Sequence, residues 1–339
     1  MELHHLIVHE LIKAPEENEA RLFLSLACMP PEERAHQLIH KLNQTFEQKS
    51  DTLLGYFSSP EDALFPGYFQ ILHDSGYTKE GFQQFSRETM QALQLSLQGV
   101  TGAKGGYLVY ADYTIEEDRH LGIFLVRDTE GILFDKDDAH RSFGLKTITY
   151  LNTDKLAMAG RINIAKFQSG QARCLELIKH ASSQRTISEY FTNWIGLDRP
   201  ESSRDLTQSF LSMVEQLPPP VDEETGAPME AAVFQDQVRE YAMSAPQHTI
   251  SIKEFDQAFY KDEPKAQSYI QEQALPLEDD FRFDQGTLKR HFQHRISANG
   301  MSLQFSRRDL AEGRVRLEGD QIVIQDPEMA EKLRLTIND

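Results

Sequence analysis

Hydrophobic positions in the first hundred residues change from strand-like to helix-like spacing. β-forming residues dominate residues 5–12 and 21–27, which predicts two strands. Apolar residues then recur at helical spacing over residues 32–50 and 78–98. The dipeptide Pro30-Pro31 precedes the first of these segments, as is common at a helix start. We therefore expect two strands followed by two helices.

The next part of the chain is rich in β-forming residues. Apolar runs separated by acidic turns cover residues 107–115, 121–127, 132–134 and 146–151. Such short runs with turn signals between them predict an antiparallel meander. Together with the earlier elements, they predict that residues 1–180 form an α+β domain, an antiparallel sheet with flanking helices.

The pattern becomes mainly helical after the segment Ala157–Phe167. One helical stripe includes Trp194, and the clearest amphipathic helix begins with a capping-box-like sequence at Ser202–Asp205. Further helices are expected at residues 229–243 and 251–260, the second with a capping box of Ser251 and Glu254. Between these helices, three prolines and an acidic run predict an exposed acidic linker over residues 218–228.

The last segment combines a short helix with strands. We expect the helix at residues 287–294 and strands at 301–305, 315–317 and 322–324, with Gly319-Asp320 as a hairpin turn. Residues 181–339 are thus predicted to be a mainly helical region that ends in a small α/β-hairpin unit, residues 281–339.

Charge is distributed unevenly along this chain of 339 residues, whose 53 acidic and 35 basic residues give a net charge of −18. A protein that coats DNA is normally basic. The net charge is −7 over residues 1–180, −12 over 181–280 and +1 over 281–339. A surface that binds a polyanion is therefore expected near the C-terminus.

The basic residues of the C-terminal segment predict contacts with backbone phosphates. Between residues 281 and 316, eight basic side chains oppose only Asp284, Asp309 and Glu312. The alternative is that these cations pair with the acidic region 222–280, within one chain or across a dimer. The predicted DNA-contacting residues are Lys289, Arg290, Arg295, Arg307, Arg308, Arg314 and Arg316.

Other chemical motifs are weaker. Asp135, Asp137 and Asp138 could hold Mg²⁺ after a strand, but their composition equally suits a solvated turn. His36 and His40 lack the glutamate of a zinc-protease motif, and the glycine-rich residues 99–106 lack the Gly-Lys-Ser/Thr end of a phosphate-binding loop. We expect no catalytic residue, metal or cofactor. The isolated Cys28 and Cys174 are typical of reduced, buried thiols.

Several short motifs together resemble those of the bacterial nucleoid-associated protein family of the NdpA/YejK type. They are His9-Glu10-Leu11-Ile12-Lys13, Tyr150-Leu151-Asn152, Ala159-Gly160-Arg161-Ile162-Asn163, Tyr190-Phe191 with Trp194-Ile195-Gly196, and Thr287-Leu288-Lys289 through Ile322-Val323-Ile324. They occur in the same order over almost the whole chain. The resemblance implies a cytoplasmic protein that is found with the bacterial chromosome and binds DNA or DNA-processing partners, without a known catalytic centre.

Three hypotheses from different functional classes follow. The first is a non-enzymatic nucleoid protein that contacts double-stranded DNA through the C-terminal basic stretch. The second is an acidic interaction module that DNA-associated proteins recruit to the nucleoid. The third is a metal-dependent nuclease or phosphoesterase that uses Asp135, Asp137 and Asp138. We favour the first, and we expect no membrane contact because no long apolar run and no signal-like start is present. The sequence leaves open whether the chain forms a homodimer.

Overall fold

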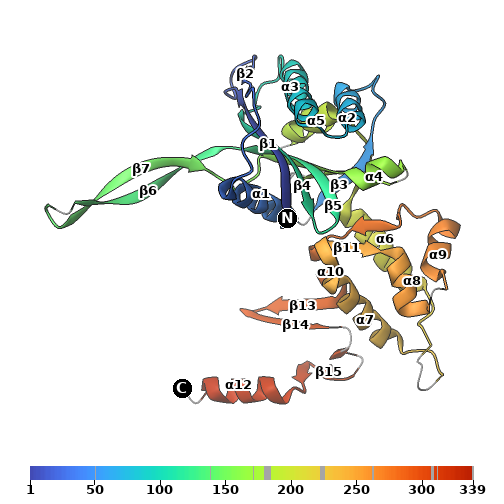
Figure 1. Ribbon diagram of the computed structural model, residues 1–339. Coiled ribbons are helices and arrows are strands. Elements are labelled where there is room, and N and C mark those ends of the chain that lie inside the picture. Colours follow the sequence, from blue (N-terminus) through green and yellow to red (C-terminus); the bar gives the residue numbers. More distant parts are fainter. Residues whose placement is uncertain are drawn as a thin grey trace. The chain divides into compact units, whose positions relative to one another are not determined.

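The chain divides into two compact units, Met1–Ser202 and Ser203–Asp339, which are described separately (Figure 1). The computed structural model describes residues 1–49, 51–137, 139–170, 172–178, 185–221, 226–261, 263–306, 309–310 and 312–337. The sequence-based division after residue 180 lies ahead of a helix and a strand, residues 185–202, that belong to the first unit.

An antiparallel sheet of eight strands forms the centre of the first unit, in the order β10-β3-β9-β8-β5-β4-β1-β2. Each neighbouring pair is antiparallel. The strands are β1 (Glu2–Ile12), β2 (Arg21–Phe23), β3 (Thr52–Phe57), β4 (Gly106–Ile115), β5 (Asp118–Val126), β8 (Met158–Asn163), β9 (Leu175–Ile178) and β10 (Leu197–Ser202).

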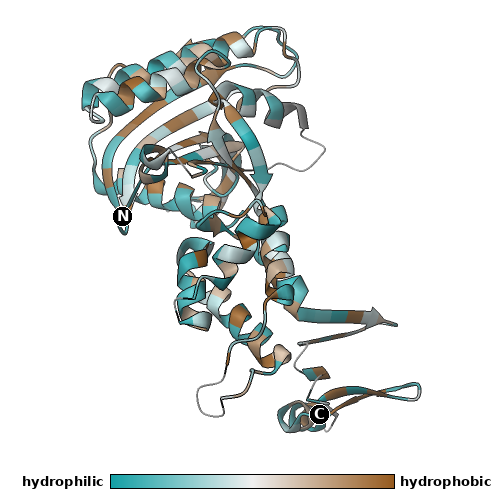
Figure 2. Cartoon of the chain, turned by 90° about the vertical axis from the view of Figure 1, so that its right-hand side faces the viewer, coloured by the Kyte–Doolittle hydropathy of each residue, from teal (hydrophilic) through white to brown (hydrophobic). Residues whose placement is uncertain are grey.

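Helices cover both faces of this sheet, which explains why the central strands are apolar on both sides. On one face, Ile39, Leu42 and Phe46 of α1 (Glu33–Glu47) join a core with β4 and β5. The opposite face packs against a second core that includes Phe65 and Trp194. Its helices are α2 (Leu64–Asp74), α3 (Lys79–Ser96) and α5 (Arg185–Ile195), and the short α4 (Ile164–Ser169) adds Phe167 to the same core. Figure 2 shows hydrophobic residues along these strands and helices.

Strands β6 (Asp128–Asp137) and β7 (Ser142–Leu151) form a separate two-stranded ribbon. The predicted four-strand meander is therefore wrong. The chain closes the ribbon where Asn152 N–H donates to the Arg127 carbonyl at 2.9 Å. The buried, apolar strand β8 then takes the position beside β5 because its side chains fill both cores. Strand β3 and helix α2 were not anticipated from the sequence.

The second unit is a helical cluster with short strand pairs. Its core gathers Phe210, Phe234, Phe255, Phe281 and Leu288. The helices are α6 (Ser203–Gln216), α7 (Ala231–Ser244), η2 (Pro246–His248), α8 (Ile252–Tyr260), α9 (Lys265–Gln273), α10 (Gln285–Phe292) and α12 (Pro327–Ile337). The strand pairs are β11 (Thr249–Ser251) with β12 (Asp280–Arg282), β13 (Gln293–Ala298) with β14 (Met301–Ser306), and β15 (Val315–Glu318) with β16 (Gln321–Ile324).

Local sequence signals explain much of this unit. Ser251 caps α8 by accepting the Glu254 N–H at 3.3 Å, as the predicted capping box requires. The turn between β15 and β16 contains Gly319 at φ 58°, in the expected hairpin position. Within the predicted linker, Val221 and Pro228 form an isolated β-bridge, while residues 222–225 lie outside the described part. The predicted α+β organisation, an antiparallel N-terminal sheet followed by helices and terminal hairpins, is confirmed.

Candidate nucleic-acid interface

Helix α10 presents the first cations of the predicted DNA-contacting set. Asp284 caps the helix, since its Oδ1 accepts the Thr287 N–H at 2.6 Å. Leu288 and Phe292 are fully buried on the inner side of the helix. Lys289 and Arg290 follow Leu288 by one and two positions. They therefore point away from the buried side of the helix and are exposed. The cap and the two apolar anchors therefore fix the direction of both cations.

The β13–β14 hairpin carries the third exposed cation, Arg295. Its Nε donates to Ser302 Oγ at 3.2 Å, across the hairpin. Residues Asn299 and Gly300 form the turn with φ of 51° and 79°, the combination that a two-residue hairpin turn requires. Strand β13 begins at Gln293, so the predicted helix over residues 287–294 is wrong at its C-terminal end, and the Asn-Gly pair is the sequence signal that identifies this hairpin.

Neither Lys289 nor Arg295 has an acidic partner among the residues that the structure describes. Arg290 is bound more closely to its own helix. It donates to Thr287 Oγ1 at 3.1 Å and approaches Asp284 at 3.9 Å. Among the described members of the predicted set, the cations without an acidic partner thus lie at the α10–β13 junction.

Two other predicted residues are neutralised locally. Arg314 contacts Asp309 at 2.8 Å and Glu312 at 3.0 Å, and Arg316 contacts Glu318 at 2.6 Å. Burial of Asp309 raises its pKa, but hydrogen bonds from Ser306 and the charge of Arg314 outweigh this effect and hold the pKa below its usual value. These partners are sequence neighbours, whereas the alternative considered above placed them in region 222–280. Arg307 and Arg308 lie outside the described residues.

A pocket of about 440 Å³ lies beside these residues but has mixed charge. Its lining includes Arg239 and Arg314 together with three carboxylates, those of Asp236, Glu240 and Asp309. Because the acids outnumber the bases, the pocket is a poor receptor for a phosphate. Arg282 also belongs to the basic stretch of the sequence, but its side chain is only 5% exposed and cannot contribute to a surface.

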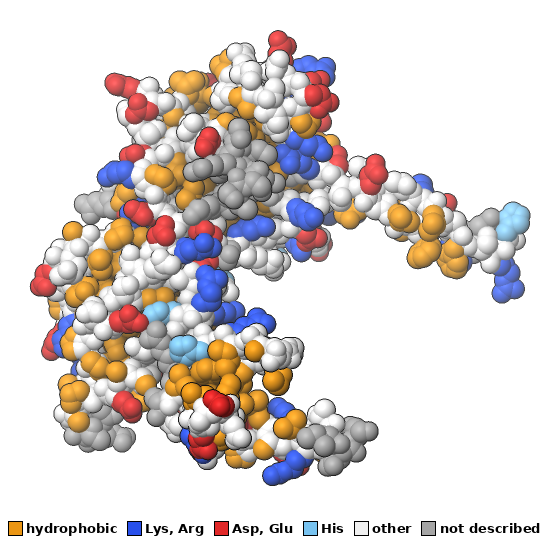
Figure 3. Space-filling model, turned by 180° about the vertical axis from the view of Figure 1, so that it is seen from behind, with side chains coloured by type: hydrophobic (Ala, Val, Ile, Leu, Met, Phe, Trp, Pro, Cys, Tyr) orange, Lys and Arg blue, Asp and Glu red, His pale blue; other side chains and the backbone are white. Residues whose placement is uncertain are grey.

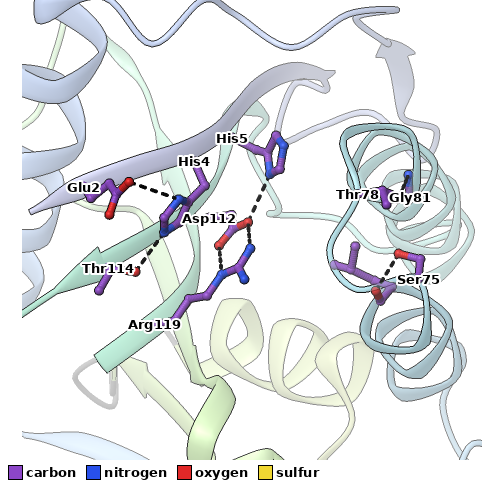
Figure 4. A network of polar contacts seen from close by, with 10 residues as sticks. Glu2, His4, His5, Ser75, Thr78, Gly81, Asp112, Thr114 and Arg119 are labelled. Atoms are coloured by element: carbon purple, nitrogen blue, oxygen red, sulfur yellow. Dashed lines mark hydrogen bonds and ion pairs between the residues drawn. The ribbon is translucent and has the colours of Figure 1, made fainter. Parts of the chain in front are cut away.

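The first unit contains a polar cluster on three adjacent strands (Figure 4). Both carboxylate oxygens of the buried Asp112 on β4 accept from Arg119, Oδ1 from Nε at 2.8 Å and Oδ2 from Nη2 at 2.7 Å, and His5 Nδ1 lies 3.1 Å from the same Oδ2. Tyr77 lies under the guanidinium of Arg119, 4.7 Å from ring centre to Cζ. The Asp–His pair resembles part of a catalytic triad, but no hydroxyl or thiol contact of His5 is found in the described chain. Asp112 is instead held as the acceptor of an ion pair.

Three glycine amides of the glycine-rich residues 99–106 already donate hydrogen bonds within the chain and are not available to a phosphate. The N–H groups of Gly99, Gly102 and Gly105 donate to the carbonyls of Asn18, Pro15 and Lys13, at 3.0, 2.7 and 2.9 Å. A Cβ on Gly105 would lie 1.9 Å from the Leu11 carbonyl oxygen, so only glycine fits this approach of the chain to β1. The segment is a structural turn into β4.

The candidate metal ligands do not converge within the described residues, where no group of three or more His, Cys, Asp or Glu side chains is placed to hold a metal ion. Asp135 is exposed on the β6–β7 ribbon, opposite Gly144. Asp138 and the side chain of Asp137 lie outside the description. On α1, the His36 ring contacts the Glu32 carbonyl at 3.1 Å and His40 is exposed.

Comparison with known protein families identifies the family of this chain. The model of the nucleoid-associated protein YejK family matches residues 7–333. The chain belongs to this family. A nucleoid-associated protein of Pseudomonas savastanoi pv. phaseolicola is 24% identical over 323 residues, which cover 92% of each chain. Another, from Pseudomonas fluorescens, is 26% identical over 318 residues, or 90% of each chain. The family that the sequence motifs indicated is confirmed.

The motifs that carry the resemblance to the YejK family lie mostly in the core of the first unit. Arg161 is buried in β8, and a Cβ on the preceding Gly160 would lie 2.6 Å from Leu177 Cδ2. Trp194 donates from Nε1 to the Thr89 carbonyl at 2.8 Å. These residues define the fold of the family member, while the exposed cations of α10 and β13 lie in the second unit. Among the described residues, no helix is both long and apolar enough to cross a bilayer.

Proposed function

We propose that this nucleoid-associated chain binds double-stranded DNA directly and without catalysis, using the exposed cations of the second unit. The observation that carries the proposal is the pair Lys289 and Arg295, both exposed and without an acidic partner in the described part of the chain. Arg290 adds a third charge at the same junction, and Arg307 and Arg308 follow β14 in the sequence. Arg314 and Arg316, already paired with acids, are expected to contribute less.

The acidic remainder of the chain shapes how such binding depends on salt. Each phosphate that a cation neutralises releases counterions, so the logarithm of the binding constant falls with the logarithm of salt by about 0.9 per contact. Repulsion between DNA and a chain of net charge −18 weakens binding further. We therefore expect modest affinity at low salt and rapid loss as salt increases.

The experiment is a binding series with labelled duplex DNA over a range of salt, with and without Mg²⁺, that reads retained and cleaved DNA together. The variants are Lys289→Gln with Arg295→Gln, and Arg307→Gln with Arg308→Gln. The matched control is Lys253→Gln, since Lys253 is an exposed lysine on α8. Each double variant is expected to weaken binding and to reduce the salt slope by about 2, while the control leaves the slope unchanged.

The same series separates the other functional classes. An unchanged slope in both double variants would remove these residues from the interface. Absence of retention at low salt would favour the acidic module, which the net charge of −12 over residues 181–280 supports. A partner retained from a DNase-treated extract, and released by salt, would be its signature. Mg²⁺-dependent cleavage that is lost in Asp135→Ala would favour a nuclease instead.

A further inference from the structure

The β6–β7 ribbon extends from the sheet of the first unit as an arm of two strands (Figure 1). Its register pairs Phe134 with Leu145 and Lys136 with Phe143. Residues directly opposite each other point to the same face, and every second residue along a strand does so too. One face therefore presents Ile132, Phe134, Phe143 and Leu145 together.

These four side chains are open to solvent. Ile132 is 75% exposed, Phe134 73%, Phe143 69% and Leu145 71%. The rings of Phe134 and Phe143 contact each other edge-on, with centroids 6.1 Å apart, so the side chains form one continuous patch. Figure 3 shows the hydrophobic side chains gathered along the projecting arm. We call these four residues the ribbon patch.

A two-stranded ribbon with an apolar face is expected to pack that face against another element. An isolated two-stranded hairpin is marginal in water, and stable examples pack one face against another element. Each phenylalanine can bury about 150–250 Å², so the ribbon patch exposes several hundred Å² in total. Contiguous apolar areas of that size on soluble proteins mark interaction surfaces.

The charges on the same face indicate which partner packs against the ribbon patch. Along β6, Glu130 and Lys136 follow the alternation of Ile132 and Phe134 and so lie at the two ends of the apolar row. They are six residues apart, about 20 Å along a strand, too far to pair with each other. When a second copy is stacked antiparallel, face to face about a two-fold axis, each Glu130 lies over the other copy's Lys136.

We propose that the ribbon patch is the interface of a homodimer, in which two β6–β7 ribbons stack antiparallel and Glu130 of each copy pairs with Lys136 of the other. The interface is isologous, because one surface serves both copies. The apolar side chains supply the burial, and the two charge pairs set the direction and register of stacking. A nucleic acid is a poorer occupant, since residues 128–151 hold five acidic and three basic side chains.

The test uses charge reversal in the full chain. Glu130→Lys places lysine opposite lysine in a homodimer, and Lys136→Glu places glutamate opposite glutamate. Each variant alone is expected to raise the dimer dissociation constant at least about tenfold in sedimentation equilibrium. Mixing the two variants restores opposite charges at both positions, so tagged Glu130→Lys chains should retain untagged Lys136→Glu chains.

The controls separate this interface from general effects of charge and folding. Lys146 lies on the opposite face of the ribbon, opposite Leu133, and Lys146→Glu changes the net charge by the same amount as Lys136→Glu. It should leave the dimer intact. Phe134→Ser should give a monomer with unchanged fluorescence of Trp194, which lies in the core of the same unit.

Defined results would overturn the proposal. They are a monomeric wild-type chain, a dimer that resists both Phe134→Ser and the charge reversals, a dimer that Lys146→Glu weakens as much as Lys136→Glu, or no complementation in the mixture. Loss of DNA affinity in Phe134→Ser without a change in oligomeric state would assign the ribbon to DNA. Because these readouts need no DNA, their failure is distinguishable from failure of the DNA-binding proposal.

Discussion

Arg161 on β8 donates from Nη2 to Glu176 Oε2 on the neighbouring strand β9 at 2.8 Å, inside the first unit. The same guanidinium donates to Glu47 of α1, and Phe46 covers it at 5.1 Å from Cζ to ring centre. Burial alone would lower the pKa of Arg161, but the charges of Glu176 and Glu47 outweigh it and raise the pKa. One buried cation thus ties helix α1 to two strands of the sheet.

Removal of this cation should strongly destabilise the first unit. Arg161→Leu removes the buried cation that pairs with Glu47 and Glu176, and breaking a buried ion pair from one side typically costs about 3–5 kcal/mol. Urea unfolding followed by Trp194 fluorescence measures this loss, because the only tryptophan of the chain lies in this unit. Arg334→Leu is the control, since its partner Glu331 is also exposed, and we expect a change within about 0.5 kcal/mol. Equal effects of the two substitutions would contradict the role of the network.

The first unit should also lose stability as the pH falls from 6.5 to 4, because two histidines are buried in neutral form. Burial and, to a lesser extent, the charge of Arg87 lower the pKa of His9 to about 4. Its Nδ1 accepts the Ser25 N–H at 3.1 Å while Nε2 lies 2.9 Å from Ser86 Oγ, a pattern that requires the neutral ring. Burial, followed by the charge of Arg161, lowers the pKa of His120 to about 3.

The sign of this effect follows from proton binding. Below pH 6.5 the unfolded chain binds protons at these histidines and the folded chain does not, so the stability that is present above 6.5 falls with pH, by about 1.4 kcal/mol per unit of pKa difference. In the described structure neither ring nitrogen of His120 has a hydrogen-bond partner. His120→Phe should therefore raise stability at pH 5 and flatten its pH dependence. Urea midpoints at pH 5 and pH 7 measure both, and an unchanged dependence would argue against a neutral His120.

The cap of α10 should affect both stability and the proposed interface. Asp284→Ala removes the acceptor for the Thr287 N–H and should cost the second unit about 1–2 kcal/mol. Hydrogen exchange of the α10 amides measures the local loss of stability. DNA binding should weaken as well, because Lys289 and Arg290 lose their fixed direction. Asp284→Asn keeps an acceptor and should retain most of the protection. A helix that is equally protected in both variants would show that packing alone maintains it.

The turn of the β13–β14 hairpin offers a separate test of Arg295. Gly300 adopts φ 79°, so Gly300→Val introduces strain of about 1–2 kcal/mol and should loosen the hairpin. We expect DNA affinity close to that of Arg295→Gln. The control is Gly286→Ala in α10, where an added Cβ would find its nearest neighbour at 3.4 Å and the backbone φ is not positive. Undiminished affinity in Gly300→Val would show that the hairpin geometry is unimportant for binding.

The sequence alone determined the elements whose signals are local. The helical stripe of α6, the Ser251 cap of α8 and the glycine turn between β15 and β16 follow from apolar spacing, side-chain acceptors and backbone freedom. The family could be recognised for the same reason, because its motifs are short core segments. The Asn299-Gly300 turn is an equally local signal, because both of its residues adopt positive φ.

The tertiary structure decided what depends on residues distant in sequence. Apolar alternation predicted strands at residues 132–134 and 146–151, but only strand pairing shows that β8 replaces them beside β5 and leaves the ribbon patch exposed. A count of charges could not separate Lys289 and Arg295, which have no acidic partner among the described residues, from Arg314 and Arg316, which do, since pairing depends on distances of a few ångströms. Likewise, Arg161 and Glu47 are 114 residues apart in sequence, and only the packing of α1 on the sheet brings them together.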